Sequence, residues 1–244
     1  MLAVYGMIVL TVAGFYKAAY QSLMEEVGGK VRNLAVLIAI NVDPEDVKKI
    51  YEPHDLETAS FKRIHQYFES VKATQPDLKY IDIFRPPGES GHLAHWTFVV
   101  DLYPIDTDLN GNGIIEKDEE GVLPGRVYES NNPQDEKMWQ AALYRPSTST
   151  DHFWTDEWGT YISGMASIHD PVIQKPIAVL EVDIPAGKFA QKRKAVLIVS
   201  LAAGILLAIV TVALVALLRR TRALECIRTL THNLYVWSYM EKME

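Results

Sequence analysis

Oxygen-bearing side chains recur on alternate residues in one short acidic segment, residues 108–119, which reads DLNGNGIIEKDE. Calcium takes six to eight oxygen ligands, and the loop of an EF-hand supplies them at fixed positions, with a glycine at the sixth. Gly113 occupies that sixth position here. The predicted ligands are the side chains of Asp108, Asn110 and Asn112, the backbone carbonyl of Ile114, Glu116 through a water, and both carboxylate oxygens of Glu119. The segment therefore predicts a calcium site.

The last position of this loop fixes its frame. A loop that started at Asp106 would place Lys117 at the final ligand position, and a cation cannot bind calcium. The residues before the loop read as strand and turn, so we expect an isolated loop inserted into another fold, with Ile115 anchoring it to the core. Neutral amides replace charged ligands at two positions, which predicts weak, mainly structural binding, at about 10⁻⁴–10⁻³ M as in extracellular modules. A solvated turn rich in Asn and Gly is the alternative.

Aromatic and acidic residues of the central region are candidates for a second site, a pocket for a small molecule. The aromatic candidates could line its wall, and the two aspartates, each near the end of a predicted strand, could orient a ligand amine. The candidates are Trp96, Asp101, Tyr128, Trp158, Tyr161 and Asp183. For the aromatic residues the alternative is an ordinary core, and for the aspartates it is the capping of turns.

Other chemistry has little support in the sequence. His92 and His95, with His152, could be zinc ligands, but no carboxylate or cysteine completes a set nearby, which favours ordinary histidines. No nucleophile motif, phosphate-binding loop or paired acid and base is present, so we expect no enzyme, and an output kinase or cyclase would lie outside this chain. The net charge of −7 gives no sign of nucleic-acid binding.

Two apolar segments bracket the central region and predict a membrane anchor at each end. Residues 195–218 are 24 residues without a charge, enough for a helix to cross a hydrocarbon core of about 30 Å. Residues 1–20 predict a first, shorter span; a cleaved signal peptide is the alternative, but no basic residue precedes Lys17. Basic residues flank the second span on both sides, so charge gives no orientation. Residues 219–244 follow as a tail.

The elements between the two spans are read from the spacing of apolar residues. Helical spacing predicts a long helix that leaves the first span and runs to about Ile40. Asp43 is placed to cap a new helix that begins at Pro44. Further helices are predicted at 60–73 and 134–143, and strands at 78–84, 95–103, 158–167 and 176–184. Helices followed by an antiparallel sheet indicate an α+β domain.

Five segments in this order resemble the Cache family, the PAS-like sensor domains of bacterial receptors. They are DLKYIDIF (77–84), HWTFVVDLYP (95–104), PGRVYES (124–130), DEWGTYISGMASIHD (156–170) and PIAVLEVDI (176–184), within a resemblance that covers about 21–188. The resemblance implies a PAS-like antiparallel sheet with a long N-terminal helix, flanked by two transmembrane helices. It also implies that the sheet forms a ligand pocket.

The resemblance further implies a role and a place in the cell. Residues 21–190 would form an extracytoplasmic sensor domain on the inner (plasma) membrane, with both termini in the cytoplasm and an unknown small-molecule ligand. The expected partners are the lipid bilayer and a second copy of the chain, with Gly204 and Ala208, four residues apart, as the homodimer face. The rival interpretation is a calcium-stabilised adhesion or scaffold protein. A deep aromatic pocket would favour the sensor, and a filled core the scaffold.

Overall fold

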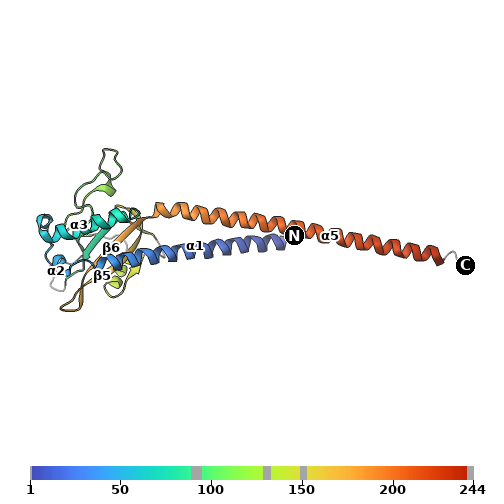
Figure 1. The fold of residues 1–244 in the computed structure, drawn as a ribbon, viewed down its shortest axis with the longest axis horizontal. Coiled ribbons are helices and arrows are strands. Elements are labelled where there is room, and N and C mark those ends of the chain that lie inside the picture. The colour runs from blue at the N-terminus through green and yellow to red at the C-terminus, as the bar shows by residue number, and fades with distance from the viewer. Residues whose placement is uncertain (1, 89–94, 129–132, 149–152, 241–244) are drawn as a thin grey trace. The chain divides into compact units, whose positions relative to one another are not determined.

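The computed structural model describes residues 2–88, 95–128, 133–148 and 153–240. The chain divides into two compact units: a central unit, residues 21–192, and a terminal unit, residues 1–20 with 193–244. Helices α1 (Leu2–Ala39) and α5 (Ala186–Met240), blue and orange to red in Figure 1, each belong partly to both units. The central unit is therefore joined to the terminal unit through two unbroken helices.

The central unit begins with helices and continues into a sheet, as predicted, although two of its helices lie between the second and third strands. Its other helices are α2 (Pro44–Val47), η1 (Pro53–Glu57), α3 (Ala59–Thr74), η2 (Lys117–Glu119) and α4 (Pro133–Ala142), where η marks a 3-10 helix. Its strands are β1 (Tyr80–Arg85), β2 (Thr97–Asp101), β3 (Ser147–Thr148), β4 (Trp154–Asp156), β5 (Gly159–Asp170) and β6 (Lys175–Pro185). These strands pair antiparallel. The predicted α+β fold with a long N-terminal helix is confirmed.

Short polar side chains fix where two of the helices begin. Asp43 accepts a hydrogen bond from the backbone amide of Glu45 at 2.9 Å, and α2 begins at Pro44, as the sequence predicts. Thr58 caps α3 in the same way, through the amide of Phe61 at 3.2 Å. Each cap satisfies an amide that the first turn of a helix leaves without a partner.

The strands form one sheet in the order β2-β1-β6-β5-β3, and β4 pairs with β5 outside this path. Successive side chains of a strand point to opposite faces. One face is aliphatic and buried, with Ile81, Ile83, Ile162, Leu180 and Val182. Helix α1 lies against this face at Gly164, where an added Cβ would sit 2.4 Å from the carbonyl carbon of Val31.

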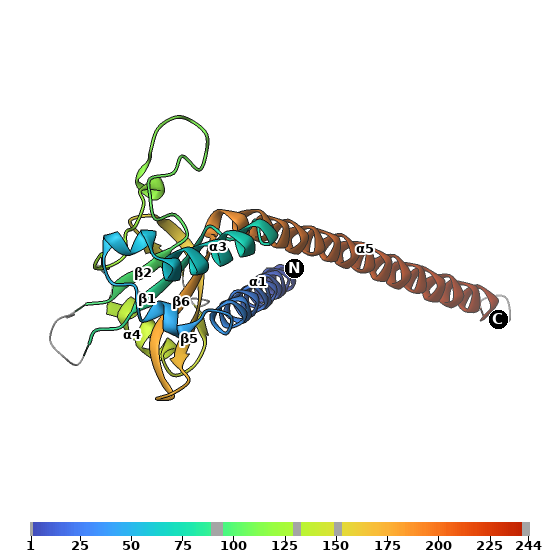
Figure 2. The same ribbon diagram turned by 60° about the vertical axis from the view of Figure 1, so that its left-hand side comes forward.

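The opposite face of the sheet carries aromatic and acidic side chains. Helix α4 covers part of it through Trp139, whose ring stacks on Phe84 with centroids 4.3 Å apart. Trp139, Trp154 and Tyr128 belong to one buried cluster on this side. Figure 2 shows the green loop between β2 and η2 projecting away from the sheet. This face and this loop hold the two predicted sites.

Four short elements were not predicted: β3, β4, η1 and η2. They contain two, three, five and three residues. Such lengths are too short for an alternating or helical pattern to develop. The predicted turn that follows β1 lies partly outside the described residues.

The terminal unit contains the apolar segments. Among the described residues, one helix is long and apolar enough to cross a membrane, at Ala186–His232 within α5. It includes the predicted span 195–218, and the predicted tail continues the same helix to Met240 instead of forming a separate element. Residues 2–20 are the start of α1, and their role as a first span stays a prediction.

The small residues of α5 pack within the chain. A Cβ added to Gly204 would lie 2.5 Å from Cγ2 of Val12, on α1. Ser200, one turn earlier, is 1% exposed. Gly204 therefore lies against α1 of its own chain, and the homodimer with its face at Gly204 and Ala208 stays a prediction.

Candidate ligand pocket and calcium loop

Three carboxylates lie in one row across the middle of the sheet. Asp82 of β1 is the register partner of Asp101 of β2 and of Glu181 of β6. Cβ atoms directly opposite on adjacent strands are about 4.5–5.5 Å apart, and like charges at that spacing repel. All three residues are buried. The row is therefore unfavourable in itself.

A second row lies next to the first. Asp183 of β6 pairs with Tyr80 of β1 on one side and with Ser163 of β5 on the other. Asp183 and Tyr80 are two residues along their strands from Glu181 and Asp82, so both rows point to the same face. We call these two rows the acidic floor; its carboxylates are Asp82, Asp101, Glu181 and Asp183.

The acidic floor forms the bottom of a pocket. Its wall is aromatic, built from Tyr80, Phe84, Phe98, Tyr103, Tyr128, Trp154 and Trp158. Its rim includes Leu109, Asp118, Glu119 and Glu120 from the loop. The empty space is about 490 Å³ when the open mouth is counted, but only about 20 Å³ can hold the centre of a water molecule. That is room for about one water, so the pocket is narrow.

Some oxygens of the acidic floor have protein partners and three have none. Trp139 donates its indole N–H to Glu181 at 3.0 Å, and the backbone amide of Tyr103 donates to Asp101. The buried oxygens without a hydrogen-bond partner are Asp82 Oδ1, Glu181 Oε1 and Asp183 Oδ1. The described residues that line the pocket include no Lys, Arg or His. The floor therefore lacks a cation of its own among the described residues.

Burial disfavours the charged form of these carboxyl groups. It raises the pKa of Asp101 to about 7 and that of Asp183 to about 8. It also raises the pKa of Asp82 and Glu181 well above their ordinary values, with repulsion from neighbouring carboxylates as the second cause. At neutral pH the floor consequently retains protons that exposed carboxyl groups would have lost.

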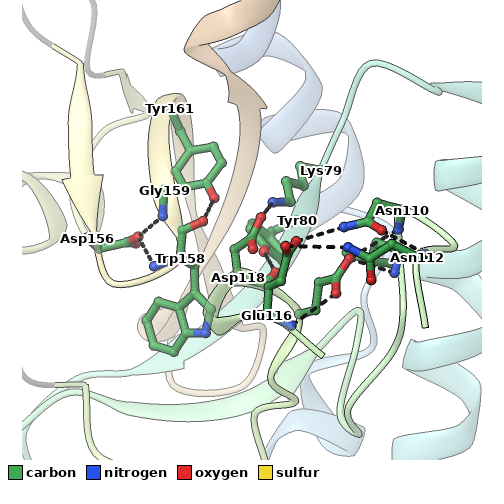
Figure 3. A network of polar contacts seen from close by, with 12 residues as sticks. Lys79, Tyr80, Asn110, Asn112, Glu116, Asp118, Asp156, Trp158, Gly159 and Tyr161 are labelled. Carbon is green, nitrogen blue, oxygen red and sulfur yellow. Dashed lines mark hydrogen bonds and ion pairs between the residues drawn. The ribbon is translucent and has the colours of Figure 1, made fainter. Parts of the chain in front are cut away.

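Tyr80 joins the acidic floor to the loop. Its hydroxyl donates to the backbone carbonyl of Asp118, whose carboxylate pairs with Lys79 (Figure 3). Its ring meets that of Tyr161 edge-on, with centroids 5.5 Å apart, and the Tyr161 hydroxyl donates to the carbonyl of Trp158. Burial raises the pKa of both tyrosines, so both hydroxyls stay protonated donors. A displacement of η2 would thus move Tyr80, which lines the pocket.

The predicted calcium loop is closed by its own backbone amides. Asp108 accepts three N–H bonds, from Gly111, Asn112 and Gly113. Glu119 accepts from the amides of Leu109, Asn110 and Glu116. Gly113 has a φ of +80°, in the region that favours glycine. These bonds fix the carboxylates of Asp108 and Glu119, the first and last predicted ligands, and close the loop between them.

The way in which the loop is anchored differs from the prediction. Ile115 is 43% exposed and does not reach the core. Glu119 is 4% exposed and ties the two ends of the loop together. A short apolar side chain on a projecting loop cannot reach the core, whereas a carboxylate at its base can collect amides from both ends.

The oxygen donors of the loop fit calcium in their chemistry. Every predicted ligand atom is an oxygen, the class that calcium prefers. Asn110 and Asn112 turn their side-chain amides toward Glu116, with N···O distances of 2.7 and 3.4 Å. Within the described part of the chain, no three His, Cys, Asp or Glu residues are grouped closely enough to hold a metal. An ion would therefore have to draw Glu116 inward, and calcium stays a prediction.

The structure brings together four of the six predicted pocket residues: Asp101, Tyr128, Trp158 and Asp183. The other two are buried beside the pocket, where Trp96 packs on Trp139 and Tyr161 on Tyr80. Asp82 and Glu181 also line the pocket and were not predicted. The sequence signal that could have identified them is an acidic residue inside an otherwise apolar strand, because acidic residues are rarely buried without a partner or a function. Of the three histidines, His92 and His152 lie outside the described residues and His95 is exposed.

Neither a family model nor a curated protein matches the sequence. Solved structures of similar fold include the ligand-binding domain of the Campylobacter jejuni chemoreceptor Tlp3 with 4-methylisoleucine, at 12% identity and a TM-score of 0.43, covering 75% of this chain and 61% of that one. The complex of the same domain with L-valine has 11% identity and a TM-score of 0.42, and the match covers 79% of this chain and 66% of that one. The extracellular domain of the histidine kinase soHK1S-Z6 has 13% identity and a TM-score of 0.38, and the match covers 79% of this chain and 66% of that one. The chain thus spans less than two thirds of each of these domains.

Proposed function

We propose that the chain is the sensing part of a membrane receptor and that its pocket binds a small molecule outside the cytoplasm. The observation that carries the proposal is the acidic floor with its unpartnered oxygens. Buried polar groups in native proteins are nearly always paired, so three unpartnered carboxylate oxygens in one pocket point to a ligand that supplies the partners.

The connection between the floor and α5 supports a role in signalling. Glu181 and Asp183 lie on β6, which ends at Pro185, and α5 begins at the next residue, Ala186. A ligand held by Asp183 therefore acts on a strand that continues directly into the candidate membrane helix. We propose that binding shifts β6 and that α5 carries this shift into the bilayer.

The proposed topology has two spans. Residues 1–20 and α5 would both cross the bilayer, with the central unit outside and both termini in the cytoplasm. Protease added to intact cells should cut the central unit and spare an epitope tag placed after Glu244. Cleavage of the tag together with a protected central unit would reverse this orientation.

We further propose that the loop at 108–119 binds calcium and that the ion has a structural role. The all-oxygen donor set supports the choice of metal. The contacts of η2 support the role, because Tyr80 and Lys79 both bind Asp118, which directly precedes the last ligand, Glu119. Calcium would stiffen one rim of the pocket, while the ligand itself would bind on the acidic floor.

The narrow interior of the pocket is the observation that favours the rival, a scaffold protein without a ligand. A thermal-shift screen of the full chain in detergent separates the two, using amino acids, amines, carboxylic acids, sugars and nucleobases. The sensor predicts at least one compound that raises the melting temperature, with the effect reduced in Trp158→Ala and kept in Asp77→Asn, an exposed residue paired with Lys188. A screen with no stabilising compound would contradict the sensor.

A further inference from the structure

Negative charge is concentrated in the pocket beyond what its own contacts use. Eight carboxyl groups line it: Asp82, Asp101, Asp118, Glu119, Glu120, Asp156, Glu181 and Asp183. Those near the rim are engaged: Asp118 pairs with Lys79 and Glu120 with Lys117, while Asp156 accepts the amides of Trp158 and Gly159. The four groups of the acidic floor have no such cation.

The buried, unpartnered atoms of the floor point independently to a ligand. Asp82, Glu181 and Asp183 are 6%, 3% and 7% exposed, and each has an oxygen without a hydrogen-bond partner. A buried carboxylate is stable only when it is paired or protonated. The floor is largely protonated because burial raises the pKa of its groups, whereas a bound cation would favour the ionised form and supply partners for these oxygens.

The lining argues against amino acids and other ligands that carry a carboxylate. Such a group needs a cation, and the described lining has no Lys, Arg or His. The described cations beside the lining are already paired. Arg126 binds Glu157 at 2.8 Å and lies 5.0 Å from the ring centroid of Trp158, and Lys79 pairs with Asp118. A carboxylate in this pocket would face the floor unpaired.

The spacing of the floor argues against a metal ion. Asp101, Asp82 and Glu181 stand on three successive strands. Strands are about 4.8 Å apart, which places the outer two carboxylates about 10 Å from each other, whereas calcium needs all its ligands at about 2.3–2.6 Å. No described group of three metal-binding side chains occurs here. The charge is spread over a length that a chain-like cation can span.

We infer that the pocket takes a slender organic cation with at least two amino groups and no carboxylate, an aliphatic diamine or polyamine. One ammonium would lie between Asp82 and Asp101, and a second would lie at Glu181 and Asp183. An unbranched hydrocarbon chain between them needs less width than a ring or a branched group, although the aromatic side chains would have to move apart to admit it. The aromatic wall suits ammonium groups through cation–π contacts. The inference rests on the proposed function and names its ligand class.

Isothermal titration calorimetry on the full chain in detergent micelles tests it with 1,4-diaminobutane. The matched probes are 1-aminobutane, with one charge, and 4-aminobutanoate, with the same length and a carboxylate in place of one amine. We expect the diamine to bind at least about tenfold more tightly than either, because a buried charge pair is lost in both. Asp82→Asn and Asp183→Asn should each weaken it by about tenfold, and Asp77→Asn should leave it unchanged.

The two floor variants keep the shape of the side chain and remove repulsion, and a melting curve of each verifies its fold. Equal affinity for 4-aminobutanoate, no heat of binding with either the diamine or spermidine, or displacement of the diamine by magnesium would each overturn the inference. A stabilising compound of another class in the screen would then still support the sensor. Failure of both experiments would remove the sensor as well.

Discussion

At the residue scale, the acidic floor opposes the stability of the sheet that holds it. Like charges directly opposite on neighbouring strands destabilise a sheet, and here Asp82 has an acidic partner on each side. Aliphatic residues at these positions would fill the same space without repulsion. The proposed ligand binding would supply a reason to keep carboxylates there, and their protonation limits the repulsion between them.

We predict that the central unit becomes less stable as the pH rises from about 5 to 8. Unfolded aspartates lose their protons near the ordinary value of 3.8, whereas Asp101 and Asp183 keep theirs until pH about 7 and 8. Between these values the folded state binds more protons, so the free energy of unfolding falls with pH. The fall is about 1.4 kcal/mol per pH unit for each proton retained. Chemical unfolding followed by tryptophan fluorescence measures it.

Asp183→Asn provides the matched comparison for this pH dependence. It removes one of the titrating groups, so the slope between pH 5 and 8 should decrease, while Asp77→Asn should keep the slope of the original chain. Carboxyl groups with a lowered pKa, such as Asp46 and Asp170, reduce the stability of the protein only when the pH falls below their ordinary pKa of 3.8. They therefore do not contribute to the change between pH 5 and 8. Stability that rises with pH up to 8 would contradict the acidic floor.

Gly164 gives a prediction about packing. A Cβ there would lie 2.4 Å from the backbone of Val31, which cannot yield as a flexible side chain could. Gly164→Ala should therefore lower the free energy of unfolding by about 1–3 kcal/mol, the usual range for overpacking. Gly29→Ala is the control, because nothing lies within 4 Å of its added Cβ, and it should stabilise helix α1 by about 0.5–1 kcal/mol. Equal effects of the two substitutions would show that α1 does not lie this close to β5.

At the element scale, the sequence predicted what periodicity encodes and little else. Long apolar patterns predicted α1, α3, β1, β5 and β6, and Asp43 and Pro44 marked the start of α2. The two rows of the acidic floor could not be predicted in the same way, because they exist only through the register of β1 with β2 and β6. Register depends on tertiary pairing, so Asp82 and Glu181 gave only the weaker signal of charge inside an apolar strand.

The loop between β2 and η2 yields a prediction about calcium. At a tenfold excess over its dissociation constant, an ion that binds only the folded state adds about 1.4 kcal/mol, which corresponds to a rise of a few degrees in the melting temperature of a domain of this size. Glu116→Gln should remove this rise without unfolding the loop, because glutamine keeps an oxygen that can accept from the side-chain amides of Asn110 and Asn112 and from the backbone amide of Glu119, the groups bound by the Glu116 side chain. Differential scanning calorimetry with calcium and with chelator measures the effect.

Glu120→Gln is the control for the calcium experiment, since it changes the same charge one residue beyond the last predicted ligand. It should keep the calcium-dependent rise. An unchanged melting temperature of the original chain with calcium and with chelator would mean that the loop is a solvated turn. In that case the closure by Asp108 and Glu119 would need no ion.

At the scale of the whole molecule, the proposed signalling would depend on which helices meet in the membrane. Small residues let helices approach closely, and the sequence analysis predicts Gly204 and Ala208 as a face against a second chain. The structure places Val12 of the same chain at Gly204. A shift of β6 would then move α5 against α1 within one subunit before any change passes to another.

A disulfide between positions 12 and 204 tests this arrangement. The Cβ of Val12 lies 3.6 Å from a Cβ built on Gly204, within the range of about 3.5–4.5 Å that a disulfide requires. In a Cys226→Ser background, Val12→Cys with Gly204→Cys should form an intrachain disulfide, seen as a monomer of altered mobility on a non-reducing gel. Val9→Cys with Gly204→Cys is the control, because Val9 is 65% exposed and points elsewhere. A dimer band in place of the intrachain product would assign Gly204 to a subunit interface, and the first contact moved by the ligand would then lie between two chains.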